Sequence, residues 1–333
     1  MGATMEKTND KQAQFLLRFR NVGAFAILAV LVVGAAILTP DHNFIRGANL
    51  QTLLSLGSEF GIIALGIGIL MIAGEFDLSV GSVLAFCSLM FIFLLEVPVD
   101  PFLALVITLV VGALVGLLNG LITVKAQVVS FIATLGTMMF WRGLTLILSG
   151  GTMRPVVLDT HPAFVSLFTG KLAGVIPAQG IWFVLFTVLL FLLLQRQRFG
   201  NWIYATGDNA LAARAMAVDT SLVKVVCFVI VSLLVAFVAV IQTTRLGAFS
   251  SRVGTGWEMR AMAAAVVGGT SLRGGRGNMV GIFVGALIII VIDNMVGLAR
   301  LAYEWTYMAF GLVILGAVLL DLLIEKRIQT AKD

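Results

Sequence analysis

The sequence predicts an all-α membrane protein: a polytopic helical bundle of about ten transmembrane helices, some of them broken or re-entrant, with both termini in the cytoplasm. Of the 333 residues, 60% are hydrophobic and 12% are charged, and the mean hydropathy is +1.06. Soluble domains average roughly 45–50% apolar and 25% charged residues. A soluble core cannot bury this much apolar surface, so lipid is the expected solvent for most of the chain.

Apolar runs near the length of a spanning helix, roughly 20 residues, recur along the whole chain. They cover residues 22–40, 51–73, 79–97, 101–124, 128–149, 178–195, 221–243, 257–271, 278–298 and 305–324. The run 257–271 is short and rich in Ala and Gly. We expect it to be a half-helix that turns back inside the protein, because irregular backbone at membrane depth must be buried in protein.

The predicted organisation is one transmembrane domain, residues 22–325, between two cytoplasmic tails, residues 1–21 and 326–333. With the N-terminus inside and strict alternation of the spans, the inside segments carry twice as many Lys and Arg residues as the outside segments. The positive-inside rule therefore supports this orientation. No basic cluster interleaved with aromatic residues occurs, so nucleic acid is not an expected partner.

Several kinds of chemistry are disfavoured by what the sequence lacks. Cys87 and Cys227 lie in apolar runs without a metal-binding spacing, so neither a disulfide nor a metal site is expected. No GxxxxGK[ST], HExxH or GxSxG motif occurs, so we expect no catalytic residue and no nucleotide bound by this chain. Membrane-embedded carboxylates look scarce, Asp293 being the clearest, which disfavours an ion-driven carrier. Energy for transport would then come from another subunit.

Small residues recur every four positions in two of the runs. Gly112, Gly116 and Gly120 form one such stripe, and residues 277, 281 and 285, all glycine, form another. Stripes of this kind let helix backbones approach closely, so they predict a tight bundle. Arg142 is the one basic residue deep in a run; we expect it to snorkel or to pair with a carbonyl near a helix break at Gly143, rather than to act on a substrate.

Between two runs, residues 208–219 predict a short cytoplasmic helix. Asp208 is suited to cap it, and from 209 to 218 it would be about 15 Å long, too short to span a membrane. Its apolar ridge consists of Leu211, Ala215 and Val218, flanked by Ala212 and Met216, with Arg214 elsewhere on the wheel. Such a ridge suits a groove on another protein, and the alternative is a helix that rests on lipid headgroups.

Two further stretches mark breaks between spans. In GEFDLSVGS, residues 74–82, Asp77 is placed to cap a helix that begins near Leu78, and the alternatives are a plain capped turn or a break beside a translocation path. The residues that we assign to a path or a helix break are Glu75, Asp77, Ser79, Asn119 and Asp293. VVGGTSLRGGRGN, residues 266–278, predicts a tight cytoplasmic turn, and its faint likeness to 74–82 suggests an internal repeat.

Residues 150–177 form the longest outside loop, which is expected either to receive an extracytoplasmic partner or to serve as a connector.

Four stretches, in order, resemble the signatures of bacterial ABC importer permeases of the ribose/xylose/arabinose/galactoside type. They are AGEFDLSVGSVLA (73–85), GLLNGLITVKAQVVSFIATLGTMMFWRGL (116–144), RFGNWIYATGDNALAARAMAVDTSLVKV (198–225) and AMAAAVVGGTSLRGGRGNMVG (261–281). The chain departs from the usual pattern at Glu75-Phe76, Ala217 and Arg260, and the departures at 75 and 260 leave the sugar open.

The resemblance implies an inner-membrane, multi-pass permease that is not itself an enzyme. A cytoplasmic ABC ATPase, which binds ATP-Mg, would grip the 208–219 helix, and a periplasmic sugar-binding protein would deliver a pentose or hexose. A second permease copy or a paralogue would complete the pathway within the membrane lipid. The alternatives are a cyclitol or furanosyl signalling molecule as cargo and, more distantly, a membrane-embedded enzyme or a stand-alone channel. An enzyme would need clustered polar groups, whereas Asn119, Arg142 and Asp293 are scattered in sequence.

Overall fold

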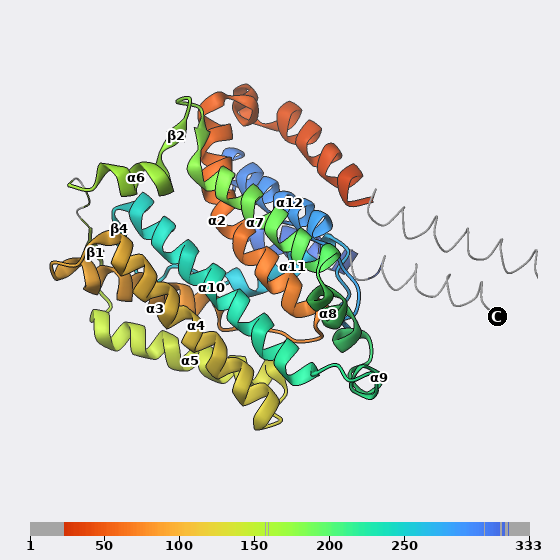
Figure 1. Ribbon diagram of the computed structural model, residues 1–333. Coiled ribbons are helices and arrows are strands. Elements are labelled where there is room, and N and C mark those ends of the chain that lie inside the picture. Colours follow the sequence, from red (N-terminus) through yellow and green to blue (C-terminus); the bar gives the residue numbers. More distant parts are fainter. Residues whose placement is uncertain are drawn as a thin grey trace, which may run out of the picture.

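The computed structural model is a bundle of long helices that run roughly along one direction, with short elements at both ends (Figure 1). It describes residues 23–156, 158, 160–302, 304–313, 315, 316 and 319. The predicted tails 1–21 and 326–333, and much of the predicted span 305–324, lie outside the described residues.

Helices lie where the apolar runs predict them. After a helix over Gly23–Leu38, the order is η1 (Pro40–Ile45), α2 (Gly47–Ile72), α3 (Val80–Glu96), α4 (Pro101–Lys125), α5 (Ser130–Ser149), α6 (Pro162–Thr169), α7 (Ala178–Arg196), α8 (Arg198–Asp208), α9 (Ala210–Ala215), α10 (Thr220–Leu246), α11 (Trp257–Val267) and α12 (Met279–Leu298). Residues 304–313 are also helical. Within the described part of the chain, α2, α4, α5, α7, α10 and α12 are long and apolar enough to cross a membrane.

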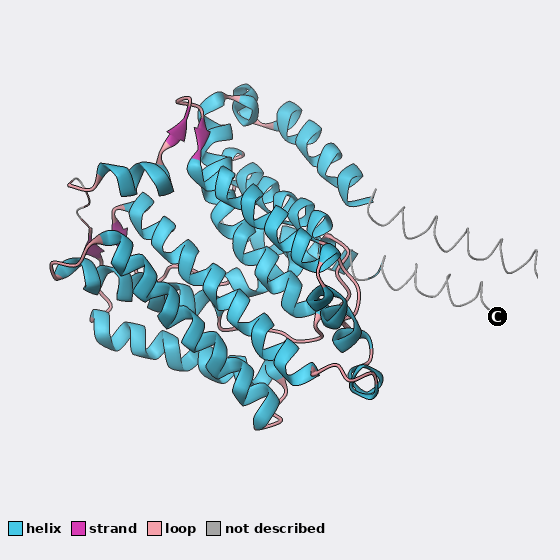
Figure 2. Ribbon diagram, viewed as in Figure 1, coloured by secondary structure: helices cyan, strands magenta, loops and turns pink. Residues whose placement is uncertain are grey.

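Among the described residues, strands form two small pairs at one end of the bundle (Figure 2). β1 (Arg154–Pro155) pairs antiparallel with β4 (Ala248–Phe249), and β2 (Lys171–Leu172) pairs with β3 (Ile176–Pro177). The first pair ties the long 150–177 loop to the segment that follows α10. The all-α prediction therefore describes the fold except for these two pairs.

The core is built around α2 and α10. Every residue of α2 from Gly57 to Ile72 is buried, which matches a sequence that is apolar on all sides of the helix. By contrast, α4, α5 and α7 expose many large apolar side chains, for example Phe140 and Ile147 on α5. In water such faces would be unfavourable, whereas in a bilayer they meet lipid.

Local signals set where several helices begin and end. Asp100 accepts hydrogen bonds from the backbone N–H groups of Phe102 and Leu103, and Pro101 occupies the first position of α4. Asp219 caps α10 and Asn278 caps α12 in the same way.

Five of the six stripe glycines lie where helices touch closely, as predicted, whereas Gly277 precedes α12 and lies in the loop before it. A methyl group at Gly116 of α4 would lie 2.6 Å from the carbonyl oxygen of Phe228 on α10, and one at Gly112 would lie 2.5 Å from Cβ of Ala236. On α12, Gly281 and Gly285 meet backbone carbonyl oxygens at the end of α11. Small residues therefore let these helix pairs pack backbone against backbone.

Arg142 bears out the expectation that it pairs with carbonyls. Its Nη1 donates to the carbonyl oxygens of Ser251 (2.7 Å) and Val253 (3.1 Å), so it holds the loop between β4 and α11. The break expected at Gly143 is wrong, because α5 continues to Ser149. The carbonyls that Arg142 needs come from a distant loop and not from its own helix.

The segment predicted as the eighth run is a helix of 11 residues, α11, which is about half of what a span requires. It follows an irregular segment, residues 250–256, and packs against α2 and α12. Gly254 and Gly256 in that segment adopt positive φ, +73° and +79°, which favours glycine.

We expect Gly116→Ala to destabilise the bundle by about 1–3 kcal/mol, because the new methyl group has no room between α4 and α10. Gly136→Ala on α5 is the matched control, since no heavy atom lies within 4 Å of the added group. Thermal denaturation in detergent, followed by size-exclusion chromatography, measures both. Equal melting temperatures for the two variants would contradict the close approach.

Candidate functional site

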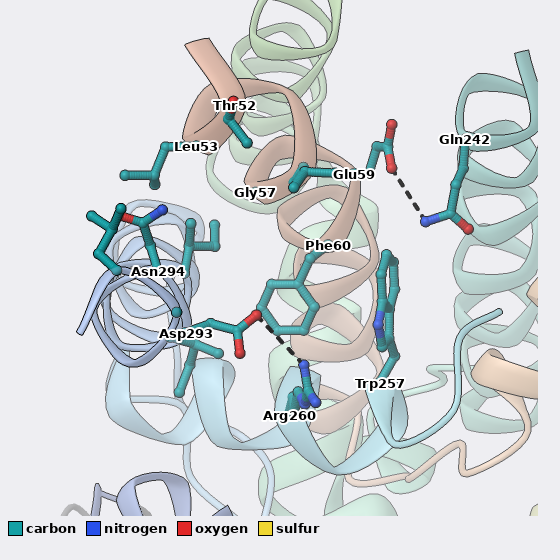
Figure 3. Close-up of a pocket in the computed structure, with 15 residues that line it drawn as sticks. Thr52, Leu53, Gly57, Glu59, Phe60, Gln242, Trp257, Arg260, Asp293 and Asn294 are labelled. Atoms are coloured by element: carbon teal, nitrogen blue, oxygen red, sulfur yellow. Dashed lines mark hydrogen bonds and ion pairs between the residues drawn. The ribbon is translucent and has the colours of Figure 1, made fainter. Parts of the chain in front are cut away.

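Two regions carry the polar and exposed groups that could serve a function: the end of the bundle at which α8 and α9 lie (Figure 1), and a cavity between α2, α10, α11 and α12 (Figure 3).

The predicted helix over 209–218 is wrong in its start and its length. Asp208 is the last residue of α8, the chain turns at Asn209, and α9 extends only from Ala210 to Ala215. Asn209 caps α9, because its Oδ1 accepts the N–H groups of Leu211 (3.1 Å) and Ala212 (3.0 Å). The Asn209 side chain takes up backbone N–H groups that would bond within a continuous helix, and so it divides the helical stretch in two.

The apolar ridge is still largely exposed. Leu211 and Met216 have exposed fractions of 78% and 80%, and Ala212 and Ala215 are exposed as well. Val218 does not belong to this surface, since it packs against the core of the bundle. We call residues 211, 212, 215 and 216 the α9 knob.

Backbone-to-backbone contacts fix the end of α8, which leads directly into this knob. Gly207 abuts the carbonyl oxygen of Ile72 and the N–H of Gly275, with no space for a side chain. The Gly275 N–H donates to the same Ile72 carbonyl (2.9 Å), and a methyl group at Gly274 would lie 2.8 Å from Cα of Gly74. We call these four glycines (74, 207, 274 and 275) the glycine junction. It joins α8, the end of α2 and the 268–278 loop.

Side chains reinforce the junction. The Tyr204 hydroxyl on α8 donates to the carbonyl oxygen of Gly277 (2.8 Å), and partial burial raises the pKa of this phenol, an effect that the hydrogen bond from Gln195 opposes. Arg214 Nε on α9 donates to Thr220 Oγ1 at the start of α10 (2.7 Å). The α9 knob is thus linked to α10 through Arg214 and, through α8, to the end of α2 and the 268–278 loop.

The 73–79 loop brings together three of the predicted path residues. Asp77 Oδ1 accepts from the N–H (2.7 Å) and the hydroxyl (2.6 Å) of Ser79, and Asn119 Nδ2 on α4 donates to that hydroxyl oxygen (2.9 Å). All three residues are fully buried, with Asp77 Oδ2 and Asn119 Oδ1 left without a partner. They form a packed helix break and do not line the cavity.

The helix expected near Leu78 begins at Val80, with Ser79 as its N-cap residue, so the expectation that Asp77 caps it is wrong. The chain before it runs along α5, where Ser130 and Thr134 hydroxyls accept the N–H groups of Phe76 (3.1 Å) and Leu78 (3.0 Å). Nearby, Glu75 forms an ion pair with Lys224 on α10 (2.5 Å) and so lies apart from the Asp77 cluster.

The cavity has a volume of about 390 Å³, within the roughly 300–1,000 Å³ typical of small-molecule sites. Its walls combine apolar, aromatic, amide and charged side chains from α2, α10, α11 and α12. They are Thr52, Leu53, Leu56, Gly57, Glu59, Phe60, Gln242, Trp257, Arg260, Ile289, Ile290, Asp293, Asn294, Gly297 and Leu298. In Figure 3, Phe60 and Trp257 lie between Gln242 on one side and Asp293 and Asn294 on the other. The two rings meet edge to face, with centroids 5.8 Å apart.

A buried ion pair borders the cavity. Arg245 on α10 donates from Nε to Glu59 Oε1 (2.6 Å) and from Nη2 to Oε2 (2.9 Å), and Gln242 Nε2 donates to Oε2 (3.2 Å). Glu59 has no exposed surface, so it is a more deeply embedded carboxylate than Asp293. The expectation that Asp293 is the clearest such group is therefore wrong. Glu59 is the one charged residue in the run 51–73, and that feature was the available signal.

A second pair of opposite charges, Arg260 and Asp293, also lines the cavity. Arg260 Nη1 on α11 lies 3.8 Å from Asp293 Oδ2 on α12, and its guanidinium lies over the Phe310 ring, 5.1 Å from the centroid. Asn294 and Asn49 exchange two amide hydrogen bonds (3.0 and 2.9 Å), which join α12 to α2. Across the described part of the chain, no group of three or more His, Cys, Asp or Glu residues is placed to hold a metal ion.

Comparisons with known proteins agree with one another. The model of the family described as "Branched-chain amino acid transport system / permease component" matches residues 49–318. The chain is 37% identical to the ribose import permease protein of Bacillus subtilis (strain 168), over 95% of this chain and 97% of the relative. It is 33% identical to the D-allose transport system permease protein of Escherichia coli (strain K12), over 96% and 97%.

A third relative is the autoinducer 2 import system permease protein of Yersinia enterocolitica, 32% identical over 89% of this chain and 81% of the relative. No solved structure matches the chain.

We expect Arg245→Met to destabilise the protein by about 3–5 kcal/mol, because Glu59 is left as a buried charge without a counter-ion. The double variant Glu59→Gln with Arg245→Met should recover most of this loss. Arg154→Met, which breaks a partly exposed pair with Glu96, should cost no more than about 1 kcal/mol. Melting temperatures in detergent compare the three, and a double variant no more stable than Arg245→Met alone would refute the explanation.

We expect Gly207→Ala to loosen the α9 knob, because the added methyl group meets the Ile72 carbonyl oxygen inside the glycine junction. Hydrogen exchange of residues 209–216 should become faster than in the unchanged protein. Gly143→Ala, with no heavy atom within 4 Å of the added group, serves as the control and should leave this exchange unchanged. Unaltered exchange in Gly207→Ala would show that the junction does not fix the knob.

Proposed function

The chain belongs to the family of branched-chain amino acid transport system permease components, and from this premise we propose that it is the membrane subunit of an ABC importer for a monosaccharide, a pentose or hexose. The observation that carries this function is similarity over nearly the full length to ribose and D-allose permeases. Members of the family are permease components of transport systems and not enzymes.

Energy for transport would come from a separate cytoplasmic ABC ATPase that binds ATP-Mg. The α9 knob supports this assignment, because exposed apolar side chains on a well-anchored protrusion suit a groove on a partner. ATP-driven movement of that partner would pass through the glycine junction to α2, α8 and the 268–278 loop. In this proposal the α9 knob would take the coupling role that the sequence assigned to residues 208–219.

A periplasmic sugar-binding protein would dock at the opposite end of the bundle, where the β1–β4 and β2–β3 pairs and α6 lie (Figure 1). This arrangement follows from the orientation that basic residues favour, with about ten spans and both termini in the cytoplasm of the inner membrane. In that orientation α11 is a re-entrant half-helix. A second copy of this chain, or a paralogue, would complete the pathway.

A second candidate cargo is autoinducer 2, the molecule for which one group of relatives is named. The ribose permease of Bacillus subtilis, at 37% identity, supports ribose-type sugars, but that of Escherichia coli (strain K12), at 32%, is as similar as the autoinducer 2 permeases, at 31–32%. The deciding measurement is uptake of radiolabelled D-ribose by cells that express the permease with its ATPase and binding protein. Competition by D-allose, other pentoses and hexoses, cyclitols and autoinducer 2 ranks the cargoes. If none of these sugars is taken up or competes, the monosaccharide assignment fails.

We expect Leu211→Asp to weaken binding of the ATPase at least about thirtyfold, the effect of losing one interface hot spot of about 2 kcal/mol. The change places a charge on the exposed α9 knob and touches no core contact. Leu172→Asp on β2, also an exposed leucine but at the other end of the bundle, should bind the ATPase normally. Co-purification from membranes measures both, and normal binding by Leu211→Asp would rule out docking through the knob.

A further inference from the structure

A second cavity, of about 360 Å³, lies at the end of the bundle where α6, β2 and the start of α7 meet (Figure 1). We propose that it binds the headgroup of an anionic phospholipid of the surrounding membrane, and that the Lys171 ammonium contacts the lipid phosphate. This inference goes beyond the proposed transport function and does not depend on which cargo is carried.

The level of the cavity along α7 is the first argument. This helix is long and apolar enough to span a membrane, and the cavity lies along its first two turns, where Ala178, Ile181, Trp182 and Leu185 line it. Tryptophan is enriched where a membrane meets water, because its amphipathic ring suits the level of the headgroups. The cavity therefore lies where a lipid headgroup can reach it.

An apolar face of α7 continues from the cavity along the helix. Ile181 and Leu185 line the cavity, and Val188, Leu189 and Leu192 follow on the same face, at 7, 8 and 11 positions after Ile181. All five side chains are exposed. In a bilayer such a face meets acyl chains. A lipid whose headgroup occupies the cavity can thus lay its chains along α7, which a small soluble anion cannot do.

The charge of the lining indicates an anionic headgroup. Lys171 is the one charged side chain among the described residues that line the cavity. Its Nζ donates to Gln51 Oε1 on α2 (2.7 Å), which orients the ammonium and leaves two of its three donors for a phosphate. The exposed Ser166 hydroxyl in the lining can donate to the same phosphate. A zwitterionic headgroup brings an ammonium of its own, for which the described lining offers no carboxylate.

Contacts between α6, α7 and the β2–β3 pair shape the cavity before a ligand enters. Trp182 Nε1 donates to the Leu167 carbonyl oxygen (3.1 Å), and the Trp182 ring stacks on Phe168 with centroids 5.9 Å apart, so α6 is fixed against α7. Lys171 lies opposite Pro177 in the β2–β3 pair, directly before α7 begins. A preformed site of this kind loses little freedom when a ligand binds.

The test reconstitutes the full permease chain in phosphatidylcholine liposomes that contain a minor share of phosphatidylglycerol. Bromine on the acyl chains of one lipid or the other quenches tryptophan on contact, and the difference between the unchanged protein and Trp182→Phe isolates the signal at the cavity. We expect about a fivefold preference for phosphatidylglycerol there, which corresponds to about 1 kcal/mol for one lysine. Lys171→Gln should abolish this preference. Lys125→Gln is the matched control, because Lys125 is an exposed lysine at the end of another spanning helix, α4, and does not line the cavity.

Equal quenching by the two brominated lipids in the unchanged protein, as for bulk lipid, would overturn the site. A preference that survives in Lys171→Gln would overturn it as well. So would an equal loss in both lysine variants, since the net charge of the protein would then explain the effect. None of these results bears on the proposed function, which uptake of D-ribose decides.

A second measurement does not depend on how Trp182→Phe folds. Native mass spectrometry of the full chain, released from detergent with equal amounts of the two lipids, counts the lipids that stay bound. The unchanged protein and Lys125→Gln should retain several-fold more phosphatidylglycerol than Lys171→Gln. Excess inorganic phosphate should not displace this lipid, because free phosphate has no chains for the apolar face of α7. Displacement by phosphate, or equal retention in Lys171→Gln, would refute a lipid site.

Discussion

Lipid offers no hydrogen bonds, and this constraint accounts for most of the structure. Backbone groups in the spans must be satisfied within helices, and each polar side chain inside the bundle needs a partner from another element. Arg142 finds carbonyls of the loop before α11, and Glu59 finds Arg245. Where the chain leaves helical geometry between α2 and α3, hydroxyl groups of Ser130 and Thr134 take up its N–H groups. The irregular backbone between α2 and α3 is therefore satisfied by side chains of another helix.

The same constraint explains the role of glycine. Helices in lipid gain little from burying apolar side chains against each other, so close packing and short polar contacts must hold them together. Gly116 lets α4 approach α10, and Gly285 lets α12 approach the end of α11. At the glycine junction, Gly207 and Gly275 join α8 to the end of α2 by backbone contacts. Contacts of this kind leave little freedom for one segment to move without the other.

The elements could be predicted from sequence to the extent that they depend on local information. Apolar runs located the long helices, and the spacing of glycines located their contacts, because both are properties of one segment. The break at Asn209 was missed, since Asp208 and Asn209 are both good caps and the sequence does not show which of them is used. The pair of Glu59 and Arg245 is separated by 186 positions, so no local pattern contains it. The cavity is formed by side chains of four helices, so it could not be predicted from any single stretch of the sequence either.

The cavity and the α9 knob are connected by continuous elements. From Phe60, which lines the cavity, α2 runs about 18 Å to Ile72, whose carbonyl oxygen lies in the glycine junction. Along a second route, α11 leads from Trp257 and Arg260 at the cavity to the loop that carries Gly275. The route along α2 is buried throughout, so a displacement of the knob must move the cavity walls or break junction contacts. A partner that moves the knob can thus move the walls of the cavity without touching them, which is the mechanical requirement of an importer driven by a separate ATPase.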